Sequence, residues 1–461
     1  MGKKHNPRPW DFLDNYRGKF FEGEWPSLPE MFDITVERWG SRKCFEAFSP
    51  KHILFTYTEA KAQIEKVSAW LYAQGIRKGD RVAVTGKNSP EWALAYMGIL
   101  YMGAIVVPVD YSLTDEEIEH LVDFVEIKGL FVDGERYERI GKDGKYGFKV
   151  SLEEKGHEEQ YILNLPDVGP QPTQKPVADD LAAFLFTSGT TGTPKAVMLT
   201  HKNFVADCYS AQAWMNIYET DVFYAILPIH HAYTMLAVFI EAMSVGADIV
   251  FGKRLVVSQI FKEMREGGVT MFLAVPMLYN KLISSMMKGV KEKGPFVNGL
   301  IHAMMGFSGF FKKVFKINIG KKMFGFLLKK VSLDKNRICI SGGGPLPAST
   351  FKQFNQLGID FVQGYGLTET SPIITLNPIF DYEETSIGKC LPNMEIEFRD
   401  KDEHGNGEIC VRGVNVMQGY YKNPEATAEI IDKDGWLRTG DIGYMDDRGF
   451  VYLTGRAKNI I

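Results

Sequence analysis

Residues 82–109 read VAVTGKNSPEWALAYMGILYMGAIVVPV. The apolar run 82–85 predicts a short strand, and Ser89, Pro90 and Glu91 then supply a capping hydroxyl and a first-turn proline for a helix. We expect this helix to end near Gly103 and the β-branched run 105–109 to form a second strand. A strand, a helix and a strand with short joints make a βαβ unit, so the segment predicts a parallel sheet.

Further apolar runs, mostly separated by helical patterns, extend this arrangement along the chain; they lie at 130–132, 222–227, 248–251, 269–275, 337–341 and 360–362. Residues 165–180 are rich in proline and acid and predict a surface connection. After about residue 378 the pattern changes to short alternating segments with Asp, Gly and Asn turns, at 395–399, 407–412 and 450–453. The predicted fold is therefore α/β, with two doubly wound subdomains (1–180 and 181–378) and a small antiparallel β-barrel-like subdomain (379–455).

The composition is that of a globular cytoplasmic protein. The chain has 461 residues, 45% hydrophobic and 24% charged, and its net charge of −4 gives no general attraction to nucleic acid. The five cysteines lack C-x-x-C spacing, which argues against a zinc site and suits a reducing compartment. The N-terminus has no apolar core for a signal peptide. Histidines and acids interrupt the apolar stretch 222–251, so we expect a buried strand–helix–strand there instead of a membrane span.

The strongest chemical signal is the loop TSGTTGTPK at 187–195, directly after the apolar strand 182–186. Its glycines let the backbone approach an anion, its hydroxyls can donate to phosphate oxygens, and Lys195 adds a positive charge. It is not a Walker A loop, because no Gly-Lys-Ser/Thr ends it. The alternative is an ordinary Ser/Thr/Gly surface turn, but nine contiguous residues after a strand favour a phosphate site.

Four other segments accompany this loop: SGGGP at 341–345, GYGLTET at 364–370, WLRTGD at 436–441 and GRAK at 455–458. In this order, all five resemble the signatures of the adenylate-forming superfamily of acyl-CoA synthetases, luciferases and peptide-synthetase adenylation domains. The resemblance implies that a carboxylic acid attacks the α-phosphate of ATP, with Mg²⁺ as cofactor. Because both reactants are negative, catalysis would consist mainly of alignment and charge neutralisation.

The resemblance also implies roles for individual residues. Thr187, Lys195, Thr368 and Glu369 would be catalytic, with Thr368 donating to the α-phosphate and Glu369 binding Mg²⁺. Tyr365 would stack on adenine, and Asp441 and Arg456 would bind the ribose. The remaining nucleotide-binding residues would be Ser188, Gly189, Thr190, Thr191, Gly192, Gly342, Gly343, Gly344, Pro345, Gly364 and Gly366.

His231 takes the position that borders the acid's carboxylate pocket in the family. His230 and His231 could equally be a structural pair of histidines. A metal site would need further ligands at suitable spacing, which the local sequence does not supply.

The segment GLIHAMMGFSGFFKKVFKINIGKKMFGFLLKKV at 299–331 interleaves apolar residues with lysines and has no acid. Such a composition suits peripheral binding to the inner face of an anionic membrane, but also helices that cover the protein's own core with a lysine-rich outer face. An extended segment at this place resembles the long-chain fatty-acyl-CoA synthetase branch. The expected partners are a fatty acid, ATP and CoA; the oligomeric state is left open.

In the family, the hinge that begins at Gly455 continues into a mobile C-terminal domain that carries a catalytic lysine. Residues 456–461 would be the start of this hinge, and no C-terminal domain follows them in the sequence. We therefore expect the isolated chain to bind its substrates but to turn over weakly. Two alternatives stay open at this point: an acyl-AMP ligase that passes its product to a carrier protein, and a non-catalytic acyl- and nucleotide-binding module.

Overall fold

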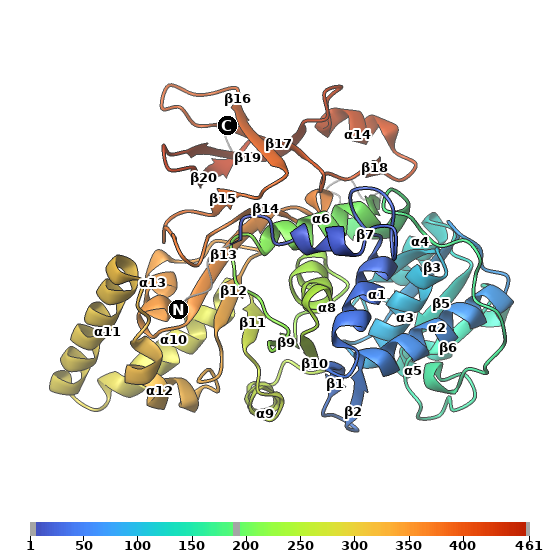
Figure 1. Cartoon of the computed structure of the whole chain (residues 1–461), viewed down its shortest axis with the longest axis horizontal. Helices are drawn as coiled ribbons and strands as arrows, with labels where there is room; N and C mark the ends of the chain where they lie inside the picture. The colour runs from blue at the N-terminus through green and yellow to red at the C-terminus, as the bar shows by residue number, and fades with distance from the viewer. Residues whose placement is uncertain (1–5, 188–193, 458–461) are drawn as a thin grey trace.

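The computed structural model describes residues 6–187 and 194–457, which form two sheets with helices between them and on their outer faces (Figure 1). The predicted βαβ unit is confirmed: β3 and β4 pair in parallel, and α3 joins them. The Ser89 hydroxyl accepts a hydrogen bond from the Trp92 N–H at 3.1 Å and caps α3. Every residue from Pro90 to Leu100 is buried, because α3 lies between the two sheets.

The smaller sheet has seven strands and is parallel in its interior. Its order is β18 (Gly419–Tyr420), β8 (Lys195–Thr200), β7 (Leu181–Thr187), β4 (Ile105–Val109), β3 (Arg81–Thr85), β5 (Gly129–Val132) and β6 (Lys149–Ser151). The β7–β8 and β8–β18 pairs are antiparallel, so this edge of the sheet is a hairpin extended by a distant strand.

The larger sheet has thirteen strands. Its order is β16 (Met394–Arg399), β17 (Gly407–Gly413), β19 (Leu437–Met445), β20 (Phe450–Arg456), β15 (Gly388–Cys390), β14 (Ile373–Leu376), β13 (Asp360–Gly366), β12 (Ile338–Ser341), β11 (Met271–Ala274), β9 (Val222–Ala225), β10 (Asp248–Phe251), β1 (Lys43–Ala47) and β2 (Ile53–Thr56). The stretch from β13 to β1 is parallel, and β13 to β16 is antiparallel, as the change of pattern after residue 378 predicted.

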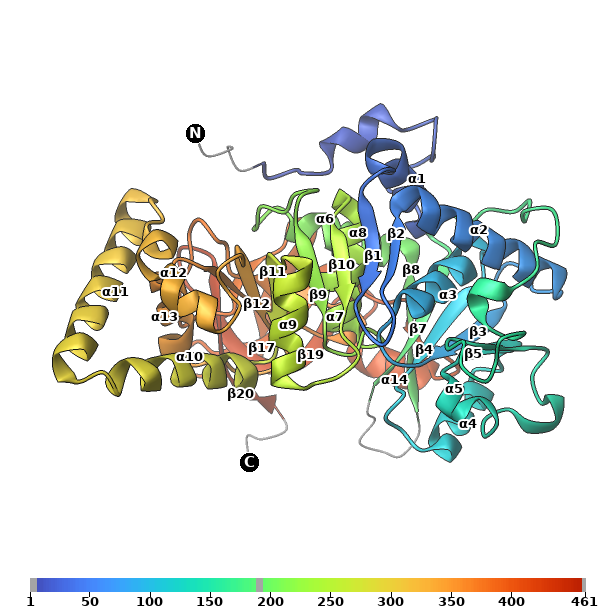
Figure 2. The same cartoon turned by 90° about the horizontal axis from the view of Figure 1, so that it is seen from below.

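The helices form a central layer and two outer ones (Figures 1 and 2). The central layer contains α1 (Leu28–Trp39), α2 (Tyr57–Ala73), α3 (Pro90–Tyr101), α6 (His201–Ala211), α7 (Ala232–Thr234), the π-helical turn η4 (Met235–Ile240) and α8 (Glu241–Val245). The smaller sheet is covered outside by α4 (Asp115–Phe124), with α5 (Gly134–Tyr137) near β6. The larger sheet is covered by α9 (Val257–Gly267), α10 (Pro276–Lys291), α11 (Pro295–Phe315), α12 (Gly320–Lys330) and α13 (Ala348–Gln356). The other short helices are α14 (Pro424–Ile430), η1 (Asp11–Asn15), η2 (Lys142–Gly144), η3 (Ile162–Asn164) and η5 (Thr368–Thr370).

The sheets cross the subdomain boundaries expected at residues 180 and 378. Strands β1 and β2 come from the first 180 residues but join the larger sheet, where Phe45 pairs in register with Ile249. Strands β7, β8 and β18 come from beyond residue 180 but join the smaller sheet. The division into three sequence ranges therefore stays a prediction about folding units and does not describe the sheets.

The apolar stretch 222–251 forms β9, the helical segment α7–η4–α8 and β10, all largely buried, as predicted. Within residues 6–187 and 194–457, no helix combines the length and the apolar character that crossing a bilayer requires.

Candidate active site

A cavity of about 360 Å³ lies where strands β9, β11, β12 and β13 end. The carboxyl ends of parallel strands are the usual place for a ligand in such sheets. Asp, Glu, Lys and Arg are absent from the described residues that line it. Its lining consists of Met215, Leu227, Pro228, His231, Ala232, Tyr233, Thr234, Ala237, Val275, Ile340, Gly342, Gly343, Gly364, Tyr365, Gly366, Leu367, Thr368, Pro372, Ile373 and Leu376. We call this the apolar cavity.

A second cavity of about 730 Å³ adjoins the first. It is lined by Pro108, Asp110, Leu113, Glu116, Glu117, His120, Leu121, Phe186, Thr187, Pro194, His230, His231 and Thr368. His231 and Thr368 line both cavities, so these two residues stand at their junction. The sequence-predicted carboxylate-pocket residue and the sequence-predicted phosphate donor are thus brought to one place.

The predicted phosphate loop begins and ends at the second cavity, which Thr187 and Pro194 line. Thr187 ends β7 and Lys195 begins β8, and the two residues are paired across the hairpin. Thr187 lines the second cavity. The predicted loop residues Ser188, Gly189, Thr190, Thr191 and Gly192 lie outside the described residues.

Glu369, the predicted magnesium ligand, is held by a residue that the sequence reasoning missed. The Tyr420 hydroxyl donates a 2.7 Å hydrogen bond to the Glu369 carboxylate, and the Lys195 ammonium lies 4.9 Å from the centre of the Tyr420 ring. Strand β18 brings Tyr420 to this position, because it pairs with β8 and sets Tyr420 opposite Val197, two residues from Lys195. Its pKa is raised, first by burial and then by the Glu369 charge. The dipeptide Gly419-Tyr420 has no local sequence feature that would predict the contact with Glu369.

This arrangement fits Mg²⁺. Magnesium is held in such sites by one or two carboxylates together with substrate phosphates. Tyr420 engages one oxygen of Glu369 and leaves the carboxylate with acceptor capacity for a cation, while the Lys195 ammonium lies over the ring of the same tyrosine.

Asp441, the predicted ribose acceptor, lies at the end of a small hydrogen-bond network. Its Oδ2 accepts a 2.7 Å hydrogen bond from the Tyr365 hydroxyl, and its Oδ1 accepts one of 3.0 Å from Arg456 Nε. The Asp441 side chain is only 7% exposed, whereas that of Arg456 is 70% exposed. Residues 441 and 456 are register partners in the β19–β20 pair, which places two separate sequence signatures side by side. A buried carboxylate with a fixed orientation suits the two hydroxyls of a ribose.

Two predicted glycines leave no room for a side chain. A Cβ on Gly366 would lie 1.7 Å from the carbonyl oxygen of Pro372, and one on Gly342 would lie 2.7 Å from the Tyr233 ring. Gly343 has a φ of +75°, which favours glycine. Gly342, Gly343, Gly364, Tyr365 and Gly366 line the apolar cavity. The other two predicted residues, Gly344 and Pro345, follow on the exposed part of the same turn.

The two histidines differ in their surroundings. His230 is buried and its Nε2 lies 3.5 Å from Oδ1 of Asp110, whose pKa is lowered by this neighbour. His231 is exposed and lines both cavities, and partial desolvation of its ring, together with the neighbouring His230, lowers its pKa to about 4. His231 is therefore neutral at physiological pH. Potential ligand atoms of Asp110, His230 and His231 lie within 4.8 Å of one another, so the fold supplies the third group that the local sequence lacked for a metal site.

Comparisons with known proteins agree with this geometry. A family model described as AMP-binding enzyme matches residues 32–421. The chain is 27% identical over 484 residues to a long-chain-fatty-acid–CoA ligase of Bacillus subtilis, covering 94% of this chain and 77% of the relative. It is 28% identical over 462 residues to 4-coumarate–CoA ligase 2 of Nicotiana tabacum, covering 93% of this chain and 75% of the relative.

The fold is similar to the solved N-terminal domain of FACL13 from Mycobacterium tuberculosis, with a TM-score of 0.74. The match covers 94% of this chain and 100% of that domain at 23% identity, so the likeness concerns the fold. The family model spans all of the catalytic signatures up to β18, including both ends of the phosphate loop and Glu369. The chain belongs to the AMP-binding enzyme family of adenylate-forming acid ligases and covers their N-terminal domain region.

Proposed function

We propose that the protein activates a long-chain fatty acid as its acyl-adenylate and that the complete enzyme then forms the thioester with CoA. Membership of the family gives the coarser activity, an ATP-dependent acid ligase that uses CoA as co-substrate. The relatives include both fatty-acid and 4-coumarate ligases, so the acid itself is the part that we propose.

The junction formed by His231 and Thr368 is the observation that carries the proposal. An acid whose hydrocarbon part lies against the aliphatic side chains of the apolar cavity would present its carboxylate at this junction, where the adjoining cavity is lined by Thr187 at the start of the phosphate loop. Neutral His231 can orient the carboxylate by a hydrogen bond without adding charge, because its pKa lies at about 4. The Thr368 hydroxyl, which lines both cavities, would donate to the phosphate that the carboxylate attacks.

The residues around the junction would hold the nucleotide in line with the acid. Asp441 would accept the ribose hydroxyls, and the turn at Gly342 and Gly343 would lie along the adenine beside Tyr365. Lys195 would offset the charge of the leaving pyrophosphate, and Glu369 would hold Mg²⁺. When bound, Mg²⁺ supplies charge neutralisation between the phosphate oxygens. Alignment and fixed charges of this kind account for most of the catalysis expected when two anions react.

The aliphatic side chains that line the apolar cavity support a fatty acid as substrate. Met215, Leu227, Val275, Ile340 and Leu376 are among them, and they offer no charged partner to a second polar group on the substrate. A phenolic acid such as 4-coumarate would bring a hydroxyl into this lining, whose polar side chains are those of His231, Tyr233, Thr234, Tyr365 and Thr368. A hydroxyl buried out of reach of these groups costs about 1 to 3 kcal/mol.

The test is pyrophosphate exchange with ATP, Mg²⁺ and a series of acids from acetate to stearate, with 4-coumarate and benzoate alongside. We expect exchange to rise with chain length and to be weak with both aryl acids. A preference for 4-coumarate over every fatty acid would refute the fatty-acid proposal while leaving the adenylation activity in place. A loss of exchange with all acids in Glu369→Gln, but not in Glu384→Gln on a distant loop, would support the role of the site.

The acyl acceptor needs a separate measurement. Acyl-AMP formed by the enzyme should be consumed on adding CoA, with release of AMP and a thioester. If a phosphopantetheine-bearing carrier protein consumes it and CoA does not, the acceptor proposal is wrong.

A further inference from the structure

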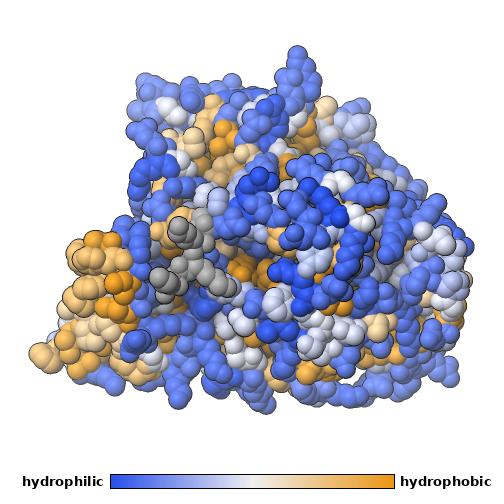
Figure 3. All heavy atoms as spheres, in the orientation of Figure 1, coloured by the Kyte–Doolittle hydropathy of each residue, from blue (hydrophilic) through white to orange (hydrophobic). Residues whose placement is uncertain are grey.

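Helix α11 carries an apolar stripe on its solvent side. Phe296, Leu300, Phe307, Phe310 and Val314 are 82%, 49%, 53%, 55% and 55% exposed. Their spacings of four, seven, three and four residues put them on one face of the helix. At 1.5 Å per residue the stripe is about 27 Å long. Figure 3 shows hydrophobic residues gathered at this edge of the molecule, where Figures 1 and 2 place α11.

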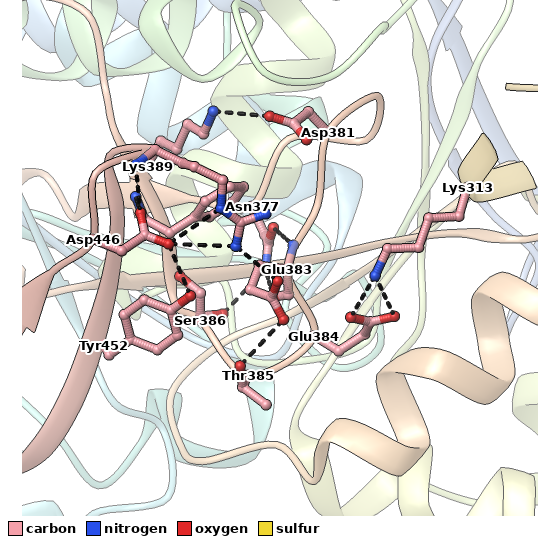
Figure 4. A network of polar contacts seen from close by, with 12 residues as sticks. Lys313, Asn377, Asp381, Glu383, Glu384, Thr385, Ser386, Lys389, Asp446 and Tyr452 are labelled. Atoms are coloured by element: carbon pink, nitrogen blue, oxygen red, sulfur yellow. Dashed lines mark hydrogen bonds and ion pairs between the residues drawn. The ribbon is translucent and has the colours of Figure 1, made fainter. Parts of the chain in front are cut away.

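The opposite face of α11 is already used. Ile301 and Met305 pack in the core under the larger sheet, and the buried Lys312 ammonium contacts Asp360 at 2.6 Å and Asn355 at 2.7 Å. Lys313 forms an ion pair with Glu384 on the loop between β14 and β15 (Figure 4). These contacts fix the helix with its apolar stripe outward. One alternative from the sequence was that this segment covers the protein's own core and turns lysines outward. For α11 the lysine-rich outer face is wrong, because the exposed face of this helix is apolar.

A cavity of about 290 Å³ lies between α10, α11 and α12, and α11 contributes Val297 and Ile301 to its walls. Its walls are mainly apolar, with Met286, Val290, Val297, Ile301 and Leu327 among them, and they also include the half-exposed Phe326.

Two exposed lysines, Lys293 and Lys330, also line the cavity. An apolar pocket that carries two ammonium groups matches one kind of ligand, an anionic amphiphile with a hydrocarbon chain. We refer to α10–α12 with this cavity as the basic lobe.

The charge of the basic lobe also favours an anionic amphiphilic partner. Residues 294–333 contain seven lysines and no Asp or Glu. A second copy of the chain docked stripe to stripe would bring two such basic surfaces together without an acidic partner, which is unfavourable. An anionic lipid bilayer provides an apolar interior boundary that can bury the stripe and negative head groups that can pair with the lysines.

We propose that the basic lobe docks on an anionic bilayer, with the α11 stripe in the head-group boundary and a lipid acyl chain in the cavity below Lys293 and Lys330. This geometry describes a helix lying in the membrane surface, in agreement with the lack of a spanning helix among the described residues. The inference goes beyond the proposed function and does not depend on it, since the cavity between α10, α11 and α12 shares no lining residue with the two cavities of the candidate active site.

The test is co-sedimentation of the chain with vesicles of phosphatidylglycerol and phosphatidylcholine, and with vesicles of phosphatidylcholine alone. We expect clear binding to the anionic vesicles only. The double variant Phe307→Ser/Phe310→Ser should bind at least tenfold more weakly. Lys293→Gln/Lys330→Gln should bind about thirtyfold more weakly at low salt, because each lysine near the surface contributes about a factor of five.

The matched control is Leu255→Ser/Val256→Ser, which removes two exposed apolar side chains before α9 (67% and 51% exposed) and should leave binding unchanged. Failure of the wild-type chain to bind anionic vesicles would overturn the proposal, as would equal binding by the stripe variant. A wild-type dimer in light scattering that the stripe variant converts to a monomer, without vesicle binding, would assign the stripe to self-association instead. None of these readouts uses catalysis, so failure here is separate from failure of the proposed function.

Discussion

The hydroxyl of Tyr365 should be the main determinant of how Asp441 is oriented for the ribose. Tyr365→Phe keeps the ring in the apolar cavity and removes only the 2.7 Å hydrogen bond to Asp441 Oδ2. A hydrogen bond to a buried carboxylate contributes about 1.5 to 3 kcal/mol. The other donor, Arg456, has a 70% exposed side chain, so its ion pair contributes about 1 kcal/mol at most. Arg456 therefore compensates little for the missing hydroxyl.

A loss of this size corresponds to a dissociation constant for AMP that is raised about 10- to 150-fold. Isothermal titration calorimetry of the purified chain with AMP measures it, and the KM for ATP in pyrophosphate exchange should rise in parallel. Tyr452→Phe is the matched control, because its hydroxyl donates to Asp446 at 3.2 Å in a separate network (Figure 4). If Tyr365→Phe binds AMP within twofold of the wild-type chain, Asp441 does not depend on this hydroxyl and the reasoning is refuted.

Three further predictions concern Gly342, the buried Glu241 and His231. Gly342→Val would place its Cβ 2.7 Å from the Tyr233 ring, and overpacking of this kind costs about 1 to 3 kcal/mol. Because this turn would lie along the adenine, the KM for ATP in pyrophosphate exchange should rise with every acid, and an unchanged KM would contradict this placement of the nucleotide. The pKa of the buried Glu241 is raised to about 8 from 4.5, so the stability that its neutral form provides is complete below pH 4.5 and is lost as the pH rises to 8. Glu241→Gln should remove this loss, worth about 5 kcal/mol, and flatten urea-unfolding stability between pH 5 and 8; an unchanged slope would contradict it. The pKa of His231 is lowered to about 4, so His231→Asn should reduce kcat/KM by the same factor from pH 5.5 to 8, and a ratio that changes near pH 6.5 would show that the ring titrates there.

Local sequence was sufficient to predict those elements that depend on residues close together in the chain. The cap at Ser89, the strands at 82–85 and 105–109 and the antiparallel pattern after residue 378 are confirmed because each depends on neighbouring residues. Sequence patterns could not assign strands to sheets. Pairing of β1 with β10 joins residues about two hundred positions apart, and apolar packing of Phe45 against Phe239 and Phe251 decides it.

The phosphate-loop ends, Thr368, Glu369, Asp441 and Arg456 were all predicted from sequence signatures, because each signature is a contiguous run of residues. Their partners were not predicted. Tyr420 reaches Glu369 only because β18 pairs with β8, and Asp110 reaches His230 only because β4 ends near the segment that follows β9.

The sequence by itself determined the family and the parallel α/β core and predicted the candidate site residues, because contiguous signatures and short-range periodicity are local features of the chain. The tertiary structure decided that His231 and Thr368 share the junction of two cavities, and that α11 turns Phe307 and Phe310 outward. Both depend on which face of an element meets the core. The face that meets the core is decided by the difference in free energy between alternative packings of segments far apart in the sequence. A helix with two apolar faces does not reveal this difference in its sequence pattern.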